Sequence, residues 1–235
     1  MANLFSSFDP IVGFMHVLIP LNWLSCIIVL FMLPQMYWIL GSQFRKSIER
    51  TVLYLEDELR AVFSALVMPG TVFLFIGVFI FIVFSNFIGL FPYIFTCTRH
   101  ISLTVTLALP IWLGRIIWSV GYQSNSLLAH LVPTGTPGPL IPVMVLIETV
   151  RRVIRPGTLS VRLGANIIAG HLLLTLLGSQ GPQRSFMLLG ILTLALILLI
   201  ILELGVACIQ AYVFTILSSL YLNELSNLSF NKKMI

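Results

Sequence analysis

Charged side chains are scarce in this chain. Asp, Glu, Lys and Arg together make up 9% of its 235 residues, whereas apolar residue types make up 58%. Soluble globular proteins carry roughly 25% charged residues, so this few cannot cover a surface that faces water. A soluble enzyme, a secreted disulfide scaffold and a disordered tail are therefore excluded, and we expect an all-α protein in lipid.

Cysteine is also rare. The three cysteines are widely spaced in apolar surroundings, and none belongs to a C-x-x-C pair. This pattern indicates neither a disulfide framework nor a zinc site. We therefore expect Cys26, Cys97 and Cys208 to be small core or lipid-facing residues, and we expect no metal and no cofactor.

Several functional motifs are absent as well. The sequence has no G-x-x-x-x-G-K phosphate loop, no H-E-x-x-H and no G-x-S-x-G. We therefore expect that the chain alone neither hydrolyses a nucleotide nor cleaves peptides. Its basic residues are scattered rather than gathered in one stripe, so nucleic acid is not an expected partner.

Stretches almost without charge predict about five membrane-embedded helices in a single membrane domain, 1–235. Each is long enough to cross ~30 Å of hydrocarbon at 1.5 Å per residue. The last two cover roughly 50 Å each, so strong tilt or a nearly in-plane course is needed to absorb the excess length. The expected segments are 14–40, 71–91, 101–120, 142–177 and 186–222.

A polar segment between the first two spans predicts a different kind of helix, over residues 48–68. Its apolar residues recur at steps of three and four among many charges, which is typical of an amphipathic helix lying in the membrane interface. The apolar stripe comprises Val52, Leu55, Leu59, Val62 and Leu66.

The distribution of Lys and Arg predicts the orientation. With five crossings, the polar segment 41–60, the arginines at 151–155 and the C-terminal lysines fall on one side, and Arg99 and Arg184 fall on the other. The positive-inside rule then places the N-terminus outside and the C-terminus inside.

Arg162 is the most unusual residue of the membrane segments. A guanidinium at this depth costs several kcal/mol and cannot escape by losing its proton, so it requires an acidic partner or water. Asn166 lies one turn further along the same helical face, among alanines and a glycine. Such a stripe of small residues permits close approach of another helix. The alternative is that Arg162 extends to the membrane surface and has no functional role.

A second buried charge, Glu203, argues for a functional role. It is the only charged residue between Phe186 and Asn223, and Gln210 returns to the same face seven residues later. His171 is about 180° around the helix from Arg162, so we expect it to meet the neighbouring helix that carries Glu203. His171 is then either a satisfied core residue or a proton carrier.

Glu148 is a third candidate, on the inner side. It lies on the face of Arg162 if the helix is unbroken, although Pro156 can interrupt that helix. Its alternative role is an ion pair with Arg151 or Arg152. Taken together, the residues predict an outer polar patch at His171 and Glu203, an inner one at Glu148 and a permanent cation between them, which amounts to a proton route with a barrier.

The same residues resemble subunit a (subunit 6) of the F-type ATP synthases. The likeness covers nearly the whole chain and is greatest to the mitochondrial form of invertebrate animals. It is carried by residues 160–171 (SVRLGANIIAGH), 147–149 (IET), 154–158 (IRPGT), 211–214 (AYVF), 86–93 (NFIGLFPY) and 129–133 (AHLVP), together with Glu203.

The resemblance implies a stator subunit against which a ring of c subunits turns, with two half-channels that lead protons to and from the ring carboxylates. By motif, Arg162 corresponds to the essential arginine facing the ring, with Asn166 and Gln210 as polar neighbours. His171 and Glu203 correspond to the outer half-channel, and Glu148 to the inner one.

The resemblance also implies a location and partners. These are the mitochondrial inner membrane, with the N-terminus toward the intermembrane space and the C-terminus toward the matrix, the c-ring and the membrane subunits of the peripheral stalk. Two other classes remain open on the sequence: a secondary cation/proton transporter, normally built from repeats, and a structural membrane subunit whose charges only pair with one another.

Overall fold

The chain is helical over most of the residues described by the computed structural model, which are 12–14, 17–19, 21–31, 43–63, 69–91, 94–129, 138–181 and 186–231. The expected all-α membrane fold is confirmed. The α-helices are α1 (Leu24–Phe31), α2 (Gln43–Val62), α3 (Pro69–Gly89), α4 (Ile101–Ala129), α5 (Ile141–Ser179) and α6 (Phe186–Asn231). Short 3-10 helices η2 (Leu21–Trp23), η3 (Cys97–Arg99) and η4 (Gly138–Leu140) precede α1, α4 and α5.

Three of these helices are long and apolar enough to cross a membrane. Within the described residues they are Gly70–Gly89, Gly138–Ser179 and Met187–Asn223, and Ile101–Gly114 is a shorter apolar helix. At 1.5 Å per residue, the 39 residues of α5 and the 46 of α6 extend about 60 and 70 Å. Both helices are thus far longer than the hydrocarbon is thick.

Two segments differ from the sequence prediction. In the expected span 14–40, β1 (Val12–Phe14) pairs antiparallel with β2 (Val17–Ile19), with Gly13 opposite Leu18, so a helix does not run through these residues. Only the 8-residue α1 follows, and residues 32–40 lie outside the described part of the chain. In the expected loop after residue 120, α4 continues to Ala129, since Gly121 alone does not terminate a helix.

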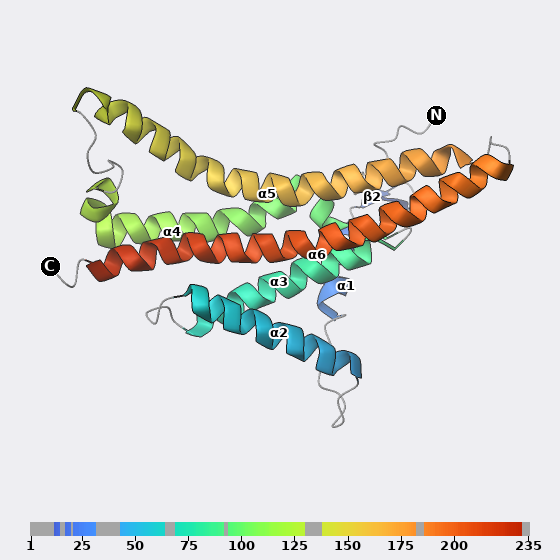
Figure 1. Ribbon diagram of the computed structural model, residues 1–235, viewed down its shortest axis with the longest axis horizontal. Coiled ribbons are helices and arrows are strands. Elements are labelled where there is room, and N and C mark those ends of the chain that lie inside the picture. The colour runs from blue at the N-terminus through green and yellow to red at the C-terminus, as the bar shows by residue number, and fades with distance from the viewer. Residues whose placement is uncertain are drawn as a thin grey trace.

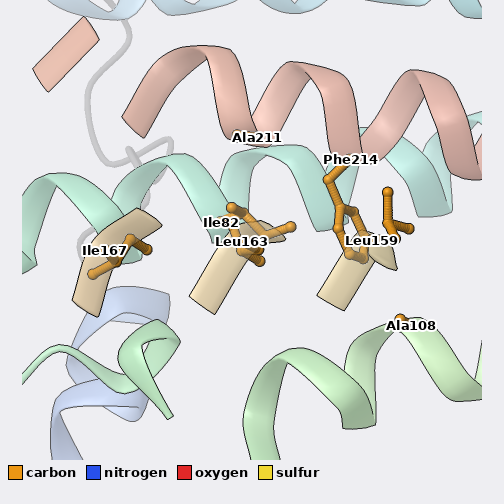
Figure 2. Packing of buried hydrophobic residues seen from close by; sticks show 7 residues of the cluster. All are labelled: Ile82, Ala108, Leu159, Leu163, Ile167, Ala211 and Phe214. Atoms are coloured by element: carbon orange, nitrogen blue, oxygen red, sulfur yellow. The ribbon is translucent and has the colours of Figure 1, made fainter. Parts of the chain in front are cut away.

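The core lies where α3, α4, α5 and α6 meet (Figure 1). Leu159, Leu163 and Ile167 recur every four residues and so form one buried face of α5 (Figure 2). Small side chains on the facing helices, Ala108 of α4 and Ala211 of α6, allow the backbones to approach closely. The opposite face of α5 is left outward.

A second apolar cluster fastens α2 to α3. Leu55 and Leu59 of the predicted stripe are buried against Phe63, Phe75 and Ile76. Two hydrogen bonds also join α2 to α6: the Tyr212 hydroxyl donates to Glu58 Oε2 at 2.9 Å, and the Asn223 side-chain amide donates to the Val62 carbonyl at 2.6 Å. The polar helix is therefore packed on the bundle along its apolar stripe.

The expectation for the cysteines is wrong for two of the three. Cys26 of α1 and Cys97 of η3 form a disulfide, with 6.1 Å between their Cα atoms, whereas Cys208 is free and exposed. The two partners are 71 residues apart in the sequence. Their pairing depends on the path of the chain between α1 and η3, which cysteine spacing does not reveal.

We expect Leu59→Ala to loosen α2. The side chain is fully buried (0% exposed), and removal of a buried leucine side chain costs about 2–5 kcal/mol. Hydrogen exchange of the α2 amides should therefore become faster in the variant. Leu53→Ala on the same helix is the matched control, because Leu53 is 54% exposed. Equal exchange rates in the two variants would contradict this packing.

Candidate functional site

Arg162 lies on the outward face of α5. It is exposed together with Ala165, Asn166 and Ala169, whereas Leu163 and Ile167 on the other face are buried. The ion pairs of the described residues do not include Arg162. Since such a charge is costly in a membrane helix, Arg162 requires an acidic partner or water.

His171 and Glu203 come together between α5 and α6. His171 Nε2 is 3.8 Å from Glu203 Oε1, and Glu203 is buried. Gly170 makes this approach possible, because a Cβ at residue 170 would lie 2.6 Å from Glu203 Oε1. Within the described residues, Glu203 Oε2 is buried and has no hydrogen-bond partner, so it can take a proton or bind a water molecule.

A small cavity of about 20 Å³ adjoins this pair. Its wall includes Asn86 of α3, Asn166 of α5, His171 and Glu203. A cavity needs roughly 10–15 Å³ to hold one water molecule, provided that it offers polar partners. The cavity therefore places polar atoms around a water-sized space that reaches from the His171–Glu203 pair to Asn166, one turn from Arg162.

The segment before α4 supplies residues that sequence reasoning did not identify as part of the site. Thr96 Oγ1 lies 3.4 Å from His171 Nε2, and Thr98 donates to Asn86 Oδ1 at 2.8 Å. The Asn86 amide in turn faces the carbonyl of Ala207 on α6 at 3.4 Å. The sequence gives no sign that Thr96 and Thr98 belong to the site, because threonines are common in helices and loops. The fold of residues 94–100 brings them close to His171 and Asn86.

Arg99 adds a second cation near the outer patch. It is buried, its guanidinium lies 5.4 Å from the centre of the Phe95 ring, and it is close enough to His171 for their charges to interact. Burial lowers the pKa of the Arg99 guanidinium. The sequence identified Arg99 only as an outer-side charge for the orientation count.

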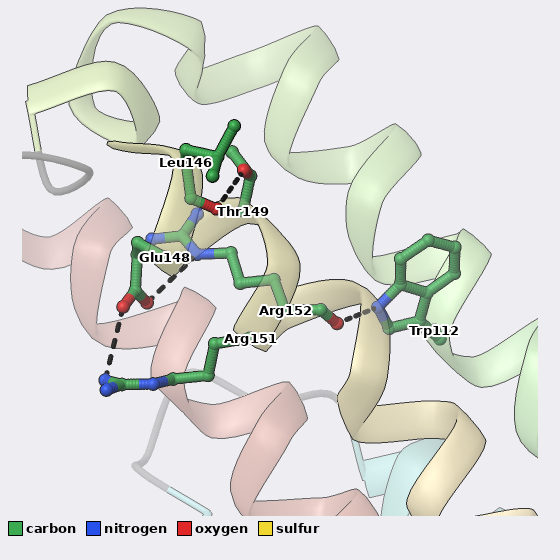
Figure 3. A network of polar contacts seen from close by, with 6 residues as sticks. All are labelled: Trp112, Leu146, Glu148, Thr149, Arg151 and Arg152. Carbon is green, nitrogen blue, oxygen red and sulfur yellow. Dashed lines mark hydrogen bonds and ion pairs between the residues drawn. The ribbon is translucent and has the colours of Figure 1, made fainter. Parts of the chain in front are cut away.

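Glu148 forms ion pairs with two arginines of its own helix, which is the alternative that the sequence left open for it. Its Oε2 lies 3.3 Å from Arg151 Nη1 and its Oε1 lies 3.5 Å from Arg152 Nε, one helical turn away (Figure 3). Both ion pairs lie within α5, on the N-terminal side of Pro156. Gln210 is half-buried on α6, next to the core residue Ala211.

The His171–Glu203 pair and its cavity can hold a proton and a water molecule, and Arg162 presents one permanent cation on an outward face of α5. Among the described residues, no group of three or more His, Cys, Asp or Glu side chains could hold a metal ion. His171 and Glu203 are side chains that can exchange protons with each other and with water.

Comparisons with known proteins point to one family. A family model described as "ATP synthase A chain" matches residues 14–223. The chain is 48% identical over 226 residues to ATP synthase subunit a of Drosophila melanogaster, covering 96% of this chain and 100% of the relative. It is 46% identical over 227 residues to that of Anopheles gambiae (96% and 100%) and 46% identical over 224 residues to that of Locusta migratoria (95% and 99%).

We expect Gly170→Ala to separate His171 from Glu203, because the new methyl group would overlap the Glu203 carboxyl group. The infrared carboxyl band of Glu203, assigned by its loss in Glu203→Gln, should shift in this variant. Gly164→Ala is the matched control on the same helix, since its Cβ would lie at an ordinary 3.7 Å from Ile101 and Thr104. An unchanged band in Gly170→Ala would contradict the close contact.

Proposed function

Because this chain belongs to the ATP synthase A chain family, we propose that it is the proton-conducting stator subunit of the membrane sector of an F-type ATP synthase. It forms two half-channels that load and unload protons on the carboxylates of a c-ring, and it couples proton flow to ring rotation and ATP synthesis. The observation that carries the proposal is Arg162, exposed on a face of small residues with no ion-pair partner among the described residues.

A ring carboxylate is the partner that this charge requires. A carboxyl group that approaches Arg162 is drawn into its ionised form, so it gives up its proton before it passes. Asn166 and Gln210 extend the polar surface that meets the ring on α5 and α6. Ala165 and Ala169, exposed on the same face as Arg162, leave room for a ring helix to come close.

Arg162 also separates the two half-channels. Its guanidinium donates hydrogen bonds but accepts none and keeps its proton, so it cannot relay protons directly between the two sides. Proton flow then requires ring rotation. One charge that crosses the membrane releases only ~2.3 kcal/mol per 100 mV, so several protons must cross for each ATP. A rotating ring can add up the free energy of several protons.

The outer half-channel enters at His171 and Glu203. The pair, the adjoining cavity and the hydroxyl groups of Thr96 and Thr98 supply polar groups along the proposed route of the proton. The inner half-channel leaves past Glu148, whose carboxyl oxygens lie 3.3 Å from Arg151 Nη1 and 3.5 Å from Arg152 Nε. The proposal needs no cofactor and no metal.

The proposed location is the mitochondrial inner membrane, with the N-terminus toward the intermembrane space and the C-terminus toward the matrix. The uneven distribution of Lys and Arg supports this orientation. Besides the c-ring, the proposed partners are membrane subunits of the peripheral stalk, protons and the lipid bilayer.

We expect Arg162→Ala to leave the complex assembled but to abolish proton-driven ATP synthesis, because the barrier between the half-channels is lost. Synthesis and passive proton conduction would be measured in vesicles that contain the whole complex. Arg60→Ala is the control, since Arg60 is an exposed cation that pairs with Glu56 of its own helix, α2. Normal coupling in Arg162→Ala would refute the proposal, and failed assembly would favour a structural role.

We expect His171→Ala and Glu203→Gln to slow proton entry from the outer side while the complex stays assembled. Each change removes a titratable group from the outer route and leaves Arg162 in place. Proton-driven synthesis in the same vesicles measures the effect. Native rates in either variant would show that the pair lies off the route, and proton flux through the purified chain without a ring would instead favour a secondary transporter.

A further inference from the structure

One backbone carbonyl of α5 lacks its helical hydrogen bond and accepts a hydrogen bond from another helix instead. Pro156 lies inside α5 and has no backbone N–H, so the carbonyl four residues earlier, that of Arg152, loses its helical donor. The proline ring also displaces that carbonyl by steric clash. In lipid an unpaired backbone carbonyl costs several kcal/mol, so it requires another donor.

Trp112 of α4 provides this donor. Its indole Nε1–H donates to the Arg152 carbonyl oxygen at 3.0 Å, across 40 residues of sequence (Figure 3). Trp112 and Pro156 also line one cavity of about 20 Å³ together with Ser218 and Tyr221 of α6. The bond therefore joins the bend of α5 to the neighbouring helix at the point where the proline interrupts the backbone.

The bend separates two functional halves of α5. The inner arm, residues 141–155, carries Glu148 and the three arginines, whereas the outer arm, 157–179, carries Arg162, Asn166 and His171. Figure 1 shows α5 changing direction along its length, so that its first half diverges from α6 while its second half runs beside it. The outer arm is fixed by the core through Leu159, Leu163 and Ile167.

We propose that Trp112 is a positioning residue that sets the direction of the inner arm of α5 through its hydrogen bond to the Arg152 carbonyl. The inference rests on the proposed function, which gives the inner arm its role in proton release. Arg152 connects the two effects, because its backbone accepts from Trp112 while its side chain pairs with Glu148 at 3.5 Å. A shift of this backbone moves the candidate inner acid.

A double-mutant cycle in the assembled complex tests the inference. Trp112→Phe removes the N–H but keeps an aromatic ring, and Pro156→Ala restores an N–H that can donate to the Arg152 carbonyl within the helix. We expect Trp112→Phe to lower proton-driven ATP synthesis roughly three- to tenfold in the native background, the usual scale for one hydrogen bond between membrane helices. In the Pro156→Ala background the same change should cost less than about twofold, because the carbonyl has a donor again.

If Pro156→Ala leaves too little ATP synthesis to measure, the melting temperature of the complex can be measured for the same four variants. Here too Trp112→Phe should destabilise the native chain and leave the Pro156→Ala chain unchanged. Equal effects in both backgrounds, or no effect of Trp112→Phe in the native chain, would overturn the inference. Either result would leave the proposed function standing, since that depends on Arg162, which the cycle does not alter.

Discussion

The permanent charge of Arg162 limits which face of α5 can be buried. A guanidinium cannot be discharged, and within the described residues this one has no ion pair. The chain buries Leu159, Leu163 and Ile167 on the other face of α5, so its core packing directs the charge outward. In lipid, such a cation requires an opposite charge or water beside it.

The length of α5 and α6 suits the spacing of the candidate site residues. Glu148, Arg162 and His171 are spaced along α5, and Glu203 lies on α6. An upright helix of ~30 Å would hold only about 20 residues in the hydrocarbon. A helix longer than this extends beyond the hydrocarbon unless it tilts.

The sequence predicts the parts of this arrangement that depend on local pattern. The absence of charge locates the long apolar helices, and the angular position of His171 on its helix predicts that it meets Glu203, the one charged residue between Phe186 and Asn223. The hairpin at 12–19, the Cys26–Cys97 pair and the wall of Thr96 and Thr98 were missed, because each depends on where a loop travels. For Glu148, spacing allowed both a channel acid and an ion pair, and the pair is what the side chains form.

Pro156 shows why local pattern and tertiary contact must be combined. The sequence shows that a proline interrupts α5, and backbone chemistry identifies the Arg152 carbonyl as the group left without a donor. It does not say which residue pairs with that carbonyl, because Trp112 reaches it only when α4 packs beside α5. Without a donor for the Arg152 carbonyl, the inner arm of α5 could take several directions. The indole N–H of Trp112 favours one of them. The position of Glu148 therefore depends on α4 as well as on α5.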